Sequence, residues 1–320
     1  MSLKRIAAAL REKNNFLISC HTSPEGDALG AELALSIALK KMGKRVLIVN
    51  DDPVPPEYSF MPGVENILRY RPKGPEFDCF VVVDCSDLKR TGEVYRLIDT
   101  QPVINIDHHI SNDKFGSINW VEPHSSSTCE MIWHLYKRLS IPIDKDAAVC
   151  LYAGIMSDTG SFRYANTTVA AHVAAADLIR RGASVTQAYR GIYENIPCRD
   201  AKFLARVLSD MHCEEKGKVI WFQLKHDALK NKKLSFDLSE ELLSFGRAVK
   251  GAEVALLFKE NLGEKNEVRI NFRSQGKVDV NAIAAFFGGG GHKNASGATV
   301  HGKINVIRKK VLAKVRQALR

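Results

Sequence analysis

The sequence has 320 residues, of which 45% are hydrophobic and 26% are charged, a balance typical of a globular protein with room for two domains. No apolar run approaches the roughly 20 residues that a membrane-spanning helix needs. The first residues, MSLKRIAAALREK, lack the apolar core of a secretory signal. We therefore expect a cytosolic protein that has no membrane partner.

The net charge of +10 is unevenly distributed. Residues 201–320 contain 23 basic and 12 acidic side chains, whereas residues 1–200 contain 23 and 24. A basic second half is typical of a protein that binds polyanions, although a basic helix can also be an ordinary solvated surface. The seven cysteines form no CxxC pair, and most sit in apolar segments, so we expect reduced core residues.

The first half of the chain alternates between strands and helices. Short continuous apolar runs at 15–20, 45–50, 77–85 and 102–106 are rich in β-branched residues, as strands covered on both faces are. Residues 27–43 show helical spacing and end at a glycine. The pattern predicts an α/β fold with a doubly wound, mainly parallel sheet.

The pattern becomes helical between residues 125 and 210. Beyond it, KVIWFQL, AEVALLFKE and EVRINFRS indicate strands, with helices expected around 238–249, 280–287 and 303–319. We therefore expect a first domain at 1–187, a linker at 188–200 and a smaller α/β domain at 201–320, with the active site in a cleft between the two domains.

Acidic residues and histidines follow three of the predicted strands and end one predicted helix. They are His21, Glu25, Asp27, Asp84, Asp107, His108, His109 and Asp158. The carboxyl ends of parallel strands meet at one edge of a sheet, so we expect these side chains to converge. Each one alone could be an ordinary helix cap or loop residue. Several carboxylates together repel one another unless a cation lies among them.

The expected ligand types indicate which cation this would be. Carboxylates and imidazoles without a thiolate favour Mn²⁺, Co²⁺, Fe²⁺ or Mg²⁺ over structural zinc. The set is large enough for two ions about 3.5–4 Å apart that share a carboxylate and a water, an arrangement that generates hydroxide at neutral pH. Such a centre hydrolyses phosphate esters.

Five segments resemble known motifs in order along nearly the whole chain. HTSPEGDALG, VVVDCSD, NIDHHISN and SDTGSFRYANTT are similar to the four motifs of the DHH phosphoesterase superfamily, and RINFRSQGKVDVNAIAAFFGGGGHKNASG resembles its DHHA1 domain. The two-domain layout resembles the nanoRNases, bacterial oligoribonucleases that also dephosphorylate pAp (3′-phosphoadenosine 5′-phosphate).

The resemblance implies roles for the residues at the strand ends. One divalent ion, most simply Mn²⁺ with Co²⁺ or Mg²⁺ as alternatives, would bind His21, Glu25 and Asp84. A second ion would bind Asp27, Asp84, His108 and Asp158, with Asp84 as the bridge. Asp107 would orient the site, and His109 would face the substrate and assist the leaving oxygen. The family commonly has aspartate at the position of Glu25, so the role of Glu25 as a ligand stays open.

The second domain supplies candidate substrate-binding residues. The glycine run GGGGH could form a backbone nest whose N–H groups surround a phosphate. This group comprises Gly288, Gly289, Gly290, Gly291 and His292. Arg273 and Ser274 end a predicted strand, and by resemblance they would bind a terminal phosphate or the substrate backbone.

Two segments of the first domain allow more than one interpretation. Arg163 follows Asp158 closely enough to contact substrate, whereas Tyr164 is interpreted as a packing residue. Ser127 and Glu130 have the spacing of a helix capping box.

The predicted activity is hydrolysis of short single-stranded RNA, including linear dinucleotides, to mononucleotides, together with conversion of pAp to AMP. The first alternative is a phosphodiesterase that acts on cyclic dinucleotides such as c-di-AMP. The second is a nucleotide- or RNA-binding module with weak catalysis. Whether the protein is a homodimer stays open.

Overall fold

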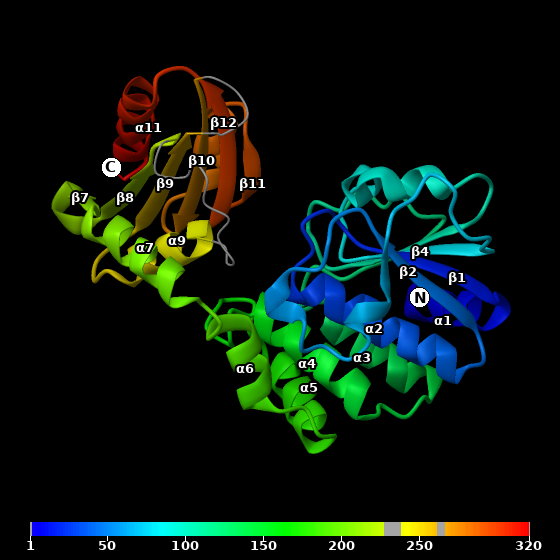
Figure 1. Ribbon diagram of the computed structural model, residues 1–320. Coiled ribbons are helices and arrows are strands. Elements are labelled where there is room, and N and C mark those ends of the chain that lie inside the picture. The colour runs from blue at the N-terminus through cyan, green and yellow to red at the C-terminus, as the bar shows by residue number, and fades with distance from the viewer. Residues whose placement is uncertain (1, 227–237, 261–265, 320) are drawn as a thin grey trace. The chain divides into compact units, whose positions relative to one another are not determined.

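The computed structural model describes residues 2–226, 238–260 and 266–319 and divides into two compact units, Met1–Asn195 and Ile196–Arg320 (Figure 1). Helix α6 (Val185–Tyr193) ends just before this division, and α7 (Cys198–Ser209) begins just after it. Helical residues therefore occupy much of the stretch 188–200 that was expected to be a linker. In the described part of the chain, no helix is both long enough and apolar enough to span a bilayer.

The first unit contains a six-stranded parallel sheet in the order β3-β2-β1-β4-β5-β6. Its strands are β1 (Asn15–Ser19), β2 (Arg45–Asn50), β3 (Ile67–Arg69), β4 (Cys79–Val83), β5 (Val103–Asp107) and β6 (Ile118–Val121). The four apolar runs of the sequence form the central strands, so the predicted parallel α/β sheet is confirmed. The edge strands β3 and β6 were not predicted.

The main core of this unit lies on one face of the sheet (Figure 1). The helices are α1 (Ser2–Glu12), α2 (Gly26–Lys41), α3 (Thr128–Leu139), α4 (Lys145–Asp158), α5 (Val169–Arg180) and α6. The other face carries a smaller apolar cluster that includes Leu17, Phe80 and Val94, the last from the 3-10 segment η3 (Leu88–Leu97). Two further 3-10 turns are η1 (Pro56–Tyr58) and η2 (Val64–Asn66).

The ends of α2 and α3 follow from their local sequence. Glu25 precedes α2 in an extended conformation, and the helix stops where Gly43 adopts a φ of +76°. The hydroxyl of Ser127 accepts a hydrogen bond of 3.0 Å from the N–H of Glu130, so the predicted cap of α3 is confirmed. The Glu130 carboxylate in turn accepts from the N–H of Ser126 at 3.0 Å.

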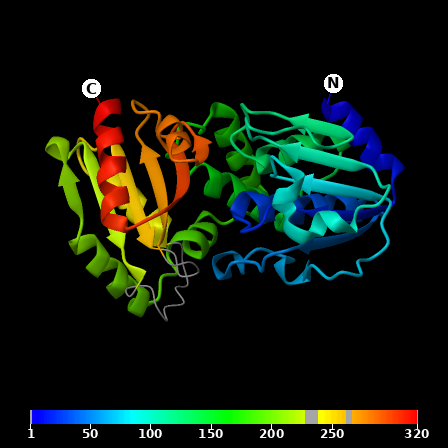
Figure 2. The ribbon, with the colours of Figure 1, turned by 90° about the horizontal axis from the view of Figure 1, so that it is seen from above.

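The second unit contains a mixed sheet in the order β11-β12-β10-β9-β8-β7, in which only β8 and β9 are parallel. Its strands are β7 (His212–Glu214), β8 (Val219–Leu224), β9 (Val254–Glu260), β10 (Glu267–Ser274), β11 (Gly290–His292) and β12 (Ala295–His301). Among the residues that the structure describes, its helices are α7, α9 (Leu238–Ala248), α10 (Val280–Phe286) and α11 (Ile304–Ala318), with one 3-10 turn, η4 (Glu215–Gly217). Figure 2 shows α11 crossing one face of this sheet, where it shares a core with α10, whereas α7 and α9 pack on the opposite face.

Two features of this unit were not predicted. The second half of the glycine run forms strand β11, which pairs with β12. Glycine has no side chain that could contribute to an apolar strand pattern, so that pattern could not predict this pairing. Cys198 and Cys213 are exposed, unlike the other five cysteines, because the first begins α7 and the second lies on the edge strand β7.

Candidate metal centre

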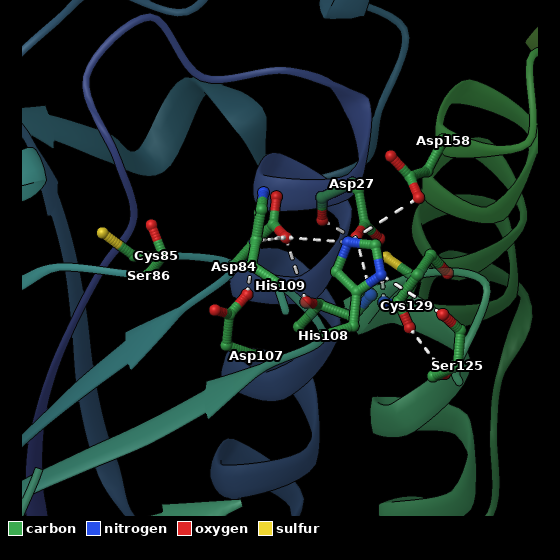
Figure 3. Close-up of polar contacts among 12 residues, drawn as sticks. Asp27, Asp84, Cys85, Ser86, Asp107, His108, His109, Ser125, Cys129 and Asp158 are labelled. Atoms are coloured by element: carbon green, nitrogen blue, oxygen red, sulfur yellow. Dashed lines mark hydrogen bonds and ion pairs between the residues drawn. The ribbon is translucent and has the colours of Figure 1, made fainter. Parts of the chain in front are cut away.

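Three adjacent strands and two helices bring the predicted residues to one edge of the parallel sheet (Figure 3). His21 follows β1, Asp84 follows β4, and the carboxyl end of β5 supplies Asp107, His108 and His109. Asp27 lies in the first turn of α2, and Asp158 is the last residue of α4. The predicted convergence at the strand ends is therefore present.

Asp84 leaves β4 in the left-handed backbone region, with a φ of +52° that is unusual for a residue other than glycine. This bend directs its carboxylate into the middle of the cluster. The oxygen Oδ1 accepts a hydrogen bond from the Thr128 hydroxyl at 3.0 Å and lies 3.6 Å from His108 Nε2. The oxygen Oδ2 lies 3.6 Å from His21 Nε2. Burial alone would raise the pKa of Asp84, but His21, His109 and His108 hold it well below its usual range.

His108 presents one ring nitrogen to three carboxylates (Figure 3). Its Nε2 lies 3.6 Å from Asp84, 3.7 Å from Asp158 and 3.9 Å from Asp27. Its Nδ1 lies 3.2 Å from the carbonyl oxygen of Ser125, which can accept the Nδ1 proton. Hydrogen bonding of one nitrogen to a carbonyl while the other faces carboxylates is typical of a metal-binding imidazole. Burial lowers the pKa of His108, but the three carboxylates outweigh this effect and raise it to about 9.

The acidic partners of His108 are themselves held in place by the chain. The carboxylate of Asp27 accepts hydrogen bonds from the N–H groups of Thr128 at 2.6 Å and Cys129 at 2.8 Å, at the start of α3. The side-chain amide of Asn166 donates to Asp158 at 3.1 Å. Thr128 and Asn166 were not predicted, although Asn166 lies within the motif SDTGSFRYANTT and Thr128 directly follows the predicted cap residue Ser127.

The pKa shifts and distances within this cluster indicate whether its residues could hold a cation. Burial, together with the negative charges of Asp84 and Asp158, raises the pKa of Asp27 to about 8. Burial and Asp84 raise the pKa of Asp158 to about 7, partly against the charge of His108. The approaches of 3.6–3.9 Å to His108 are longer than direct hydrogen bonds. A divalent ion would relieve this repulsion, and oxygen and nitrogen ligands suit the hard and borderline metals, so the residues fit such an ion.

Two groups of ligand atoms lie close enough together to share an ion. Asp27, His108 and Asp158 form one group, and Asp84, His108 and His109 form the other, with the atoms of each group within 4.8 Å of one another. His21 contacts Asp84 but belongs to neither group. Glu25 is exposed at the start of α2, and its charge raises the pKa of Asp158. The assignment of His21 and Glu25 as ligands stays a prediction.

Asp107 positions His109 rather than facing the other carboxylates. It is fully buried, and its Oδ1 lies 2.7 Å from His109 Nδ1. Its Oδ2 accepts from the amide of Asn112 at 2.6 Å, and the same amide lies 2.9 Å from Asn105. A carboxylate at this position favours a proton on Nδ1 and leaves Nε2 at the other edge of the ring. Asn112 was not predicted, although it closes the quoted motif NIDHHISN.

The candidate residues of the second unit are already hydrogen bonded within that unit. Arg273 donates to Glu240 at 2.7 Å. The hydroxyl of the buried Ser274 donates to the carbonyl of Val278 at 2.7 Å and accepts from the N–H of Gly276 at 2.9 Å. Ser274 therefore stabilises a turn.

Part of the backbone of the glycine run is hydrogen bonded within the second unit. The N–H groups of Gly288 and Gly289 donate to carbonyls of α10 at 3.0 and 2.9 Å, and Gly290 and Gly291 pair with β12. His292 is exposed at the end of β11. A substrate-binding role for these residues stays a prediction.

The two residues that follow Asp158 differ in their surroundings. Arg163 is exposed, and its Nε donates to the carbonyl of Gly160 at 2.7 Å. The ring of Tyr164 packs over Gly160, since a Cβ there would lie 2.3 Å from it. This contact agrees with the packing interpretation of Tyr164.

Comparison with known proteins agrees with this geometry. The family described as "DHH family, N-terminal domain" matches residues 15–155, and the "DHHA1 domain" matches residues 217–319. The bifunctional oligoribonuclease and PAP phosphatase NrnA of Thermus thermophilus is 31% identical over 304 residues, which cover 94% of this chain and 89% of that protein. The protein of the same name from Bacillus subtilis is 27% identical, with 90% of each chain covered.

A solved structure shows the same fold. The crystal structure of an exopolyphosphatase-related protein from Bacteroides fragilis superposes with a TM-score of 0.89 and 27% identity, covering 98% of this chain and 96% of that one. Three observations indicate the same family. They are the order of the sequence motifs, the acidic residues at one edge of the parallel sheet and the two family matches. The chain therefore belongs to the DHH family of phosphoesterases, with a DHHA1 domain as its second part.

Proposed function

We propose that this protein is a divalent-metal-dependent phosphoesterase that hydrolyses short RNA oligonucleotides to mononucleotides and converts pAp to AMP. The observation that carries the proposal is the single nitrogen of His108 that faces the carboxylates of Asp27, Asp84 and Asp158. The substrate class comes from the relatives, which are named for oligoribonuclease and PAP phosphatase activity and align with nearly the whole chain.

Two metal ions, most simply Mn²⁺, would occupy this centre. His21, Glu25 and Asp84 would hold one of them, and Asp27, Asp84, His108 and Asp158 would hold the other. When bound, the ions would supply a nucleophilic hydroxide at neutral pH and neutralise charge on the phosphate. The chain supplies the fixed positions of these ligands, through the N–H groups at the start of α3 and the carbonyl of Ser125.

His109 would act on the substrate itself. Asp107 holds the proton on Nδ1 of the ring, so Nε2 is the atom that would face the leaving oxygen and would donate to it from the ring that carries both protons. Because Asp107 is buried and also bonded to Asn112, the ring has one preferred orientation. Arg163 and the second unit, through Arg273 and the segment Gly288–His292, would bind the remaining phosphates of the substrate.

The experiment that tests this proposal is hydrolysis, in Mn²⁺, of equal concentrations of pAp, a linear dinucleotide, a five-nucleotide RNA and cyclic di-AMP, with products identified by mass spectrometry. We expect AMP from pAp and mononucleotides from both linear RNAs, and no products with Asp84→Asn. Cleavage confined to cyclic di-AMP would favour the first alternative instead. Tight binding of RNA without turnover in any metal would favour a binding module.

A further inference from the structure

Arg90 is an exposed cation close to the candidate metal centre that the family motifs leave without a role. It lies in η3, which follows β4 and Asp84. Its main-chain carbonyl accepts a hydrogen bond of 2.6 Å from the N–H of Thr22, the residue after His21. This bond joins the backbone of Arg90 to the loop that carries His21.

The backbone on either side of Arg90 is fixed. The buried Thr91 donates its hydroxyl to the carbonyl of Leu88 at 2.8 Å. Gly92 has a φ of +64°, and a Cβ at this position would lie 2.1 Å from Asp51 Oδ2. Asp87 caps the segment by accepting from the N–H of Lys89 at 2.9 Å. The position of Arg90 is therefore set by a defined turn and not by a loose loop.

The Arg90 guanidinium makes only one long contact within the part of the chain that the structure describes. Its Nη1 lies 3.4 Å from the hydroxyl of Ser86, and no carboxylate forms a salt bridge with it there. Arg181, by contrast, is paired with Asp177 at 3.1 Å. Arg90 therefore keeps most of its five donors available to an anion.

Arg90 lies beside the chain at the ends of both β1 and β4. Its carbonyl bonds to Thr22, one residue after the predicted ligand His21. Its Nη1 lies 3.4 Å from the hydroxyl of Ser86, two residues after Asp84. Both contacts place Arg90 next to segments that carry predicted metal ligands.

We propose that Arg90 binds the phosphate group that is being hydrolysed, from the side of the centre that carries His21 and Ser86. A guanidinium can contact two phosphate oxygens at once and stays charged at every working pH. The carboxylate ligands of the centre repel a phosphate, so a nearby unpaired cation would attract the substrate and stabilise negative charge on the phosphate. The inference rests on the proposed function, because it assumes that a phosphate ester is hydrolysed at this centre.

Steady-state kinetics with pAp and with a linear dinucleotide test the proposal, using wild type, Arg90→Ala, Arg90→Lys and Lys89→Ala in Mn²⁺. Lys89 is the matched control because it is the adjacent exposed cation. We expect Arg90→Ala to lower kcat/KM by about ten- to a hundredfold for both substrates. Arg90→Lys should recover part of the loss, because it keeps the charge but not the paired donors. Lys89→Ala should stay within about twofold of wild type.

Bound manganese, counted by elemental analysis, separates phosphate binding from damage to the metal site. The proposal predicts equal metal content in wild type and Arg90→Ala. It is overturned if Arg90→Ala behaves like Lys89→Ala, if its loss of activity follows a loss of metal, or if the loss is confined to pAp. Failure of the wild-type protein to hydrolyse either substrate would instead overturn the proposed function, and this inference with it.

Discussion

At the scale of single residues, the carboxylate of Asp84 lies at the centre of the candidate metal site. One oxygen lies near Thr128 and His108, and the other faces His21. A single carboxylate therefore contacts residues that follow β1 and β5 and a residue at the start of α3. Its left-handed backbone conformation is a strained feature of the kind that clusters at functional sites.

Replacing Asp84 with asparagine should lower the catalytic rate strongly while the protein stays folded. The amide keeps the volume of the side chain but loses the charge that the imidazoles face. We expect kcat to fall by roughly a hundred- to a thousandfold, measured as AMP release from pAp. Asp113→Asn, an exposed aspartate in the loop after His109, is the control and should retain activity. Similar rates for the two variants would show that the cluster is not the catalytic centre.

The titration of Asp27 and Asp158 makes the metal-free protein sensitive to pH. Their pKa values of about 8 and about 7 exceed the roughly 4 of an unfolded chain. Between pH 4 and pH 8 the folded state therefore holds protons that the unfolded chain has released, so its stability falls as pH rises. His108, with a pKa of about 9, adds to the fall above pH 6.5.

Thermal unfolding with a chelator at pH 5.5, 7.0 and 8.5 should therefore give a falling Tm. Saturating Mn²⁺ should raise Tm most at pH 8.5, where the carboxylates are most fully ionised and repel one another. Asp158→Asn should flatten the profile below pH 7. A chelated protein whose Tm rises or stays constant over this range would contradict the account of the cluster.

At the scale of elements, close packing of α2 against α4 sets the distance between Asp27 and Asp158. A Cβ on Gly30 would lie 2.5 Å from the carbonyl oxygen of Cys150 in α4. A Cβ on Gly154 would lie 3.1 Å from the Cα of Asp27 in α2 and 2.2 Å from Cys129 Sγ in α3. Both glycines are therefore needed for the approach of the helices that carry the two carboxylates.

Gly154→Ala should separate these helices and displace Asp158. We expect unfolding free energy to fall by about 1–3 kcal/mol and the rate to fall by about a hundredfold. Denaturant unfolding and pAp hydrolysis measure the two effects. Gly297→Ala is the stability control, since its added Cβ would meet its nearest atom at 3.6 Å. Unchanged stability and activity in Gly154→Ala would mean that the contact is not a constraint.

The strands differ in how well they could be predicted from the sequence. Continuous apolar runs predicted β1, β4 and β5, because each is buried on both faces. The run at 45–50 likewise predicted β2, although Leu47 in this strand is 40% exposed. Strand β3 was not predicted because it has only three residues and exposes Leu68. Strand β11 was not predicted because it consists of two glycines and a histidine, which form no apolar pattern.

At the scale of the whole molecule, each unit has cores of its own. We therefore expect a fragment of residues 1–195 to fold and to bind Mn²⁺, while hydrolysing RNA dinucleotides at least about a hundredfold more slowly than the full chain. Circular dichroism, metal analysis and product release measure the three properties. A fragment as active as the full chain would show that the second unit is dispensable for substrate binding.

The candidate site was largely predictable because its residue types and strand-end positions are visible in the sequence. Its supporting contacts were not, because they join residues distant along the chain, such as Asp27 with Thr128 and Asp158 with Asn166. Helix packing, and not local pattern, brings those partners together. The resemblance to a known family supplied the substrate class, which no single residue indicates.

The central claim is that two metal ions in this cluster drive phosphate ester hydrolysis, and it can be tested by one titration. Mn²⁺ is added stepwise to concentrated metal-free protein, and AMP release from saturating pAp is measured at each step. The account predicts no activity without metal and a rate that rises to a plateau at two equivalents per chain. A plateau at one equivalent, or hydrolysis that needs no metal, would contradict it.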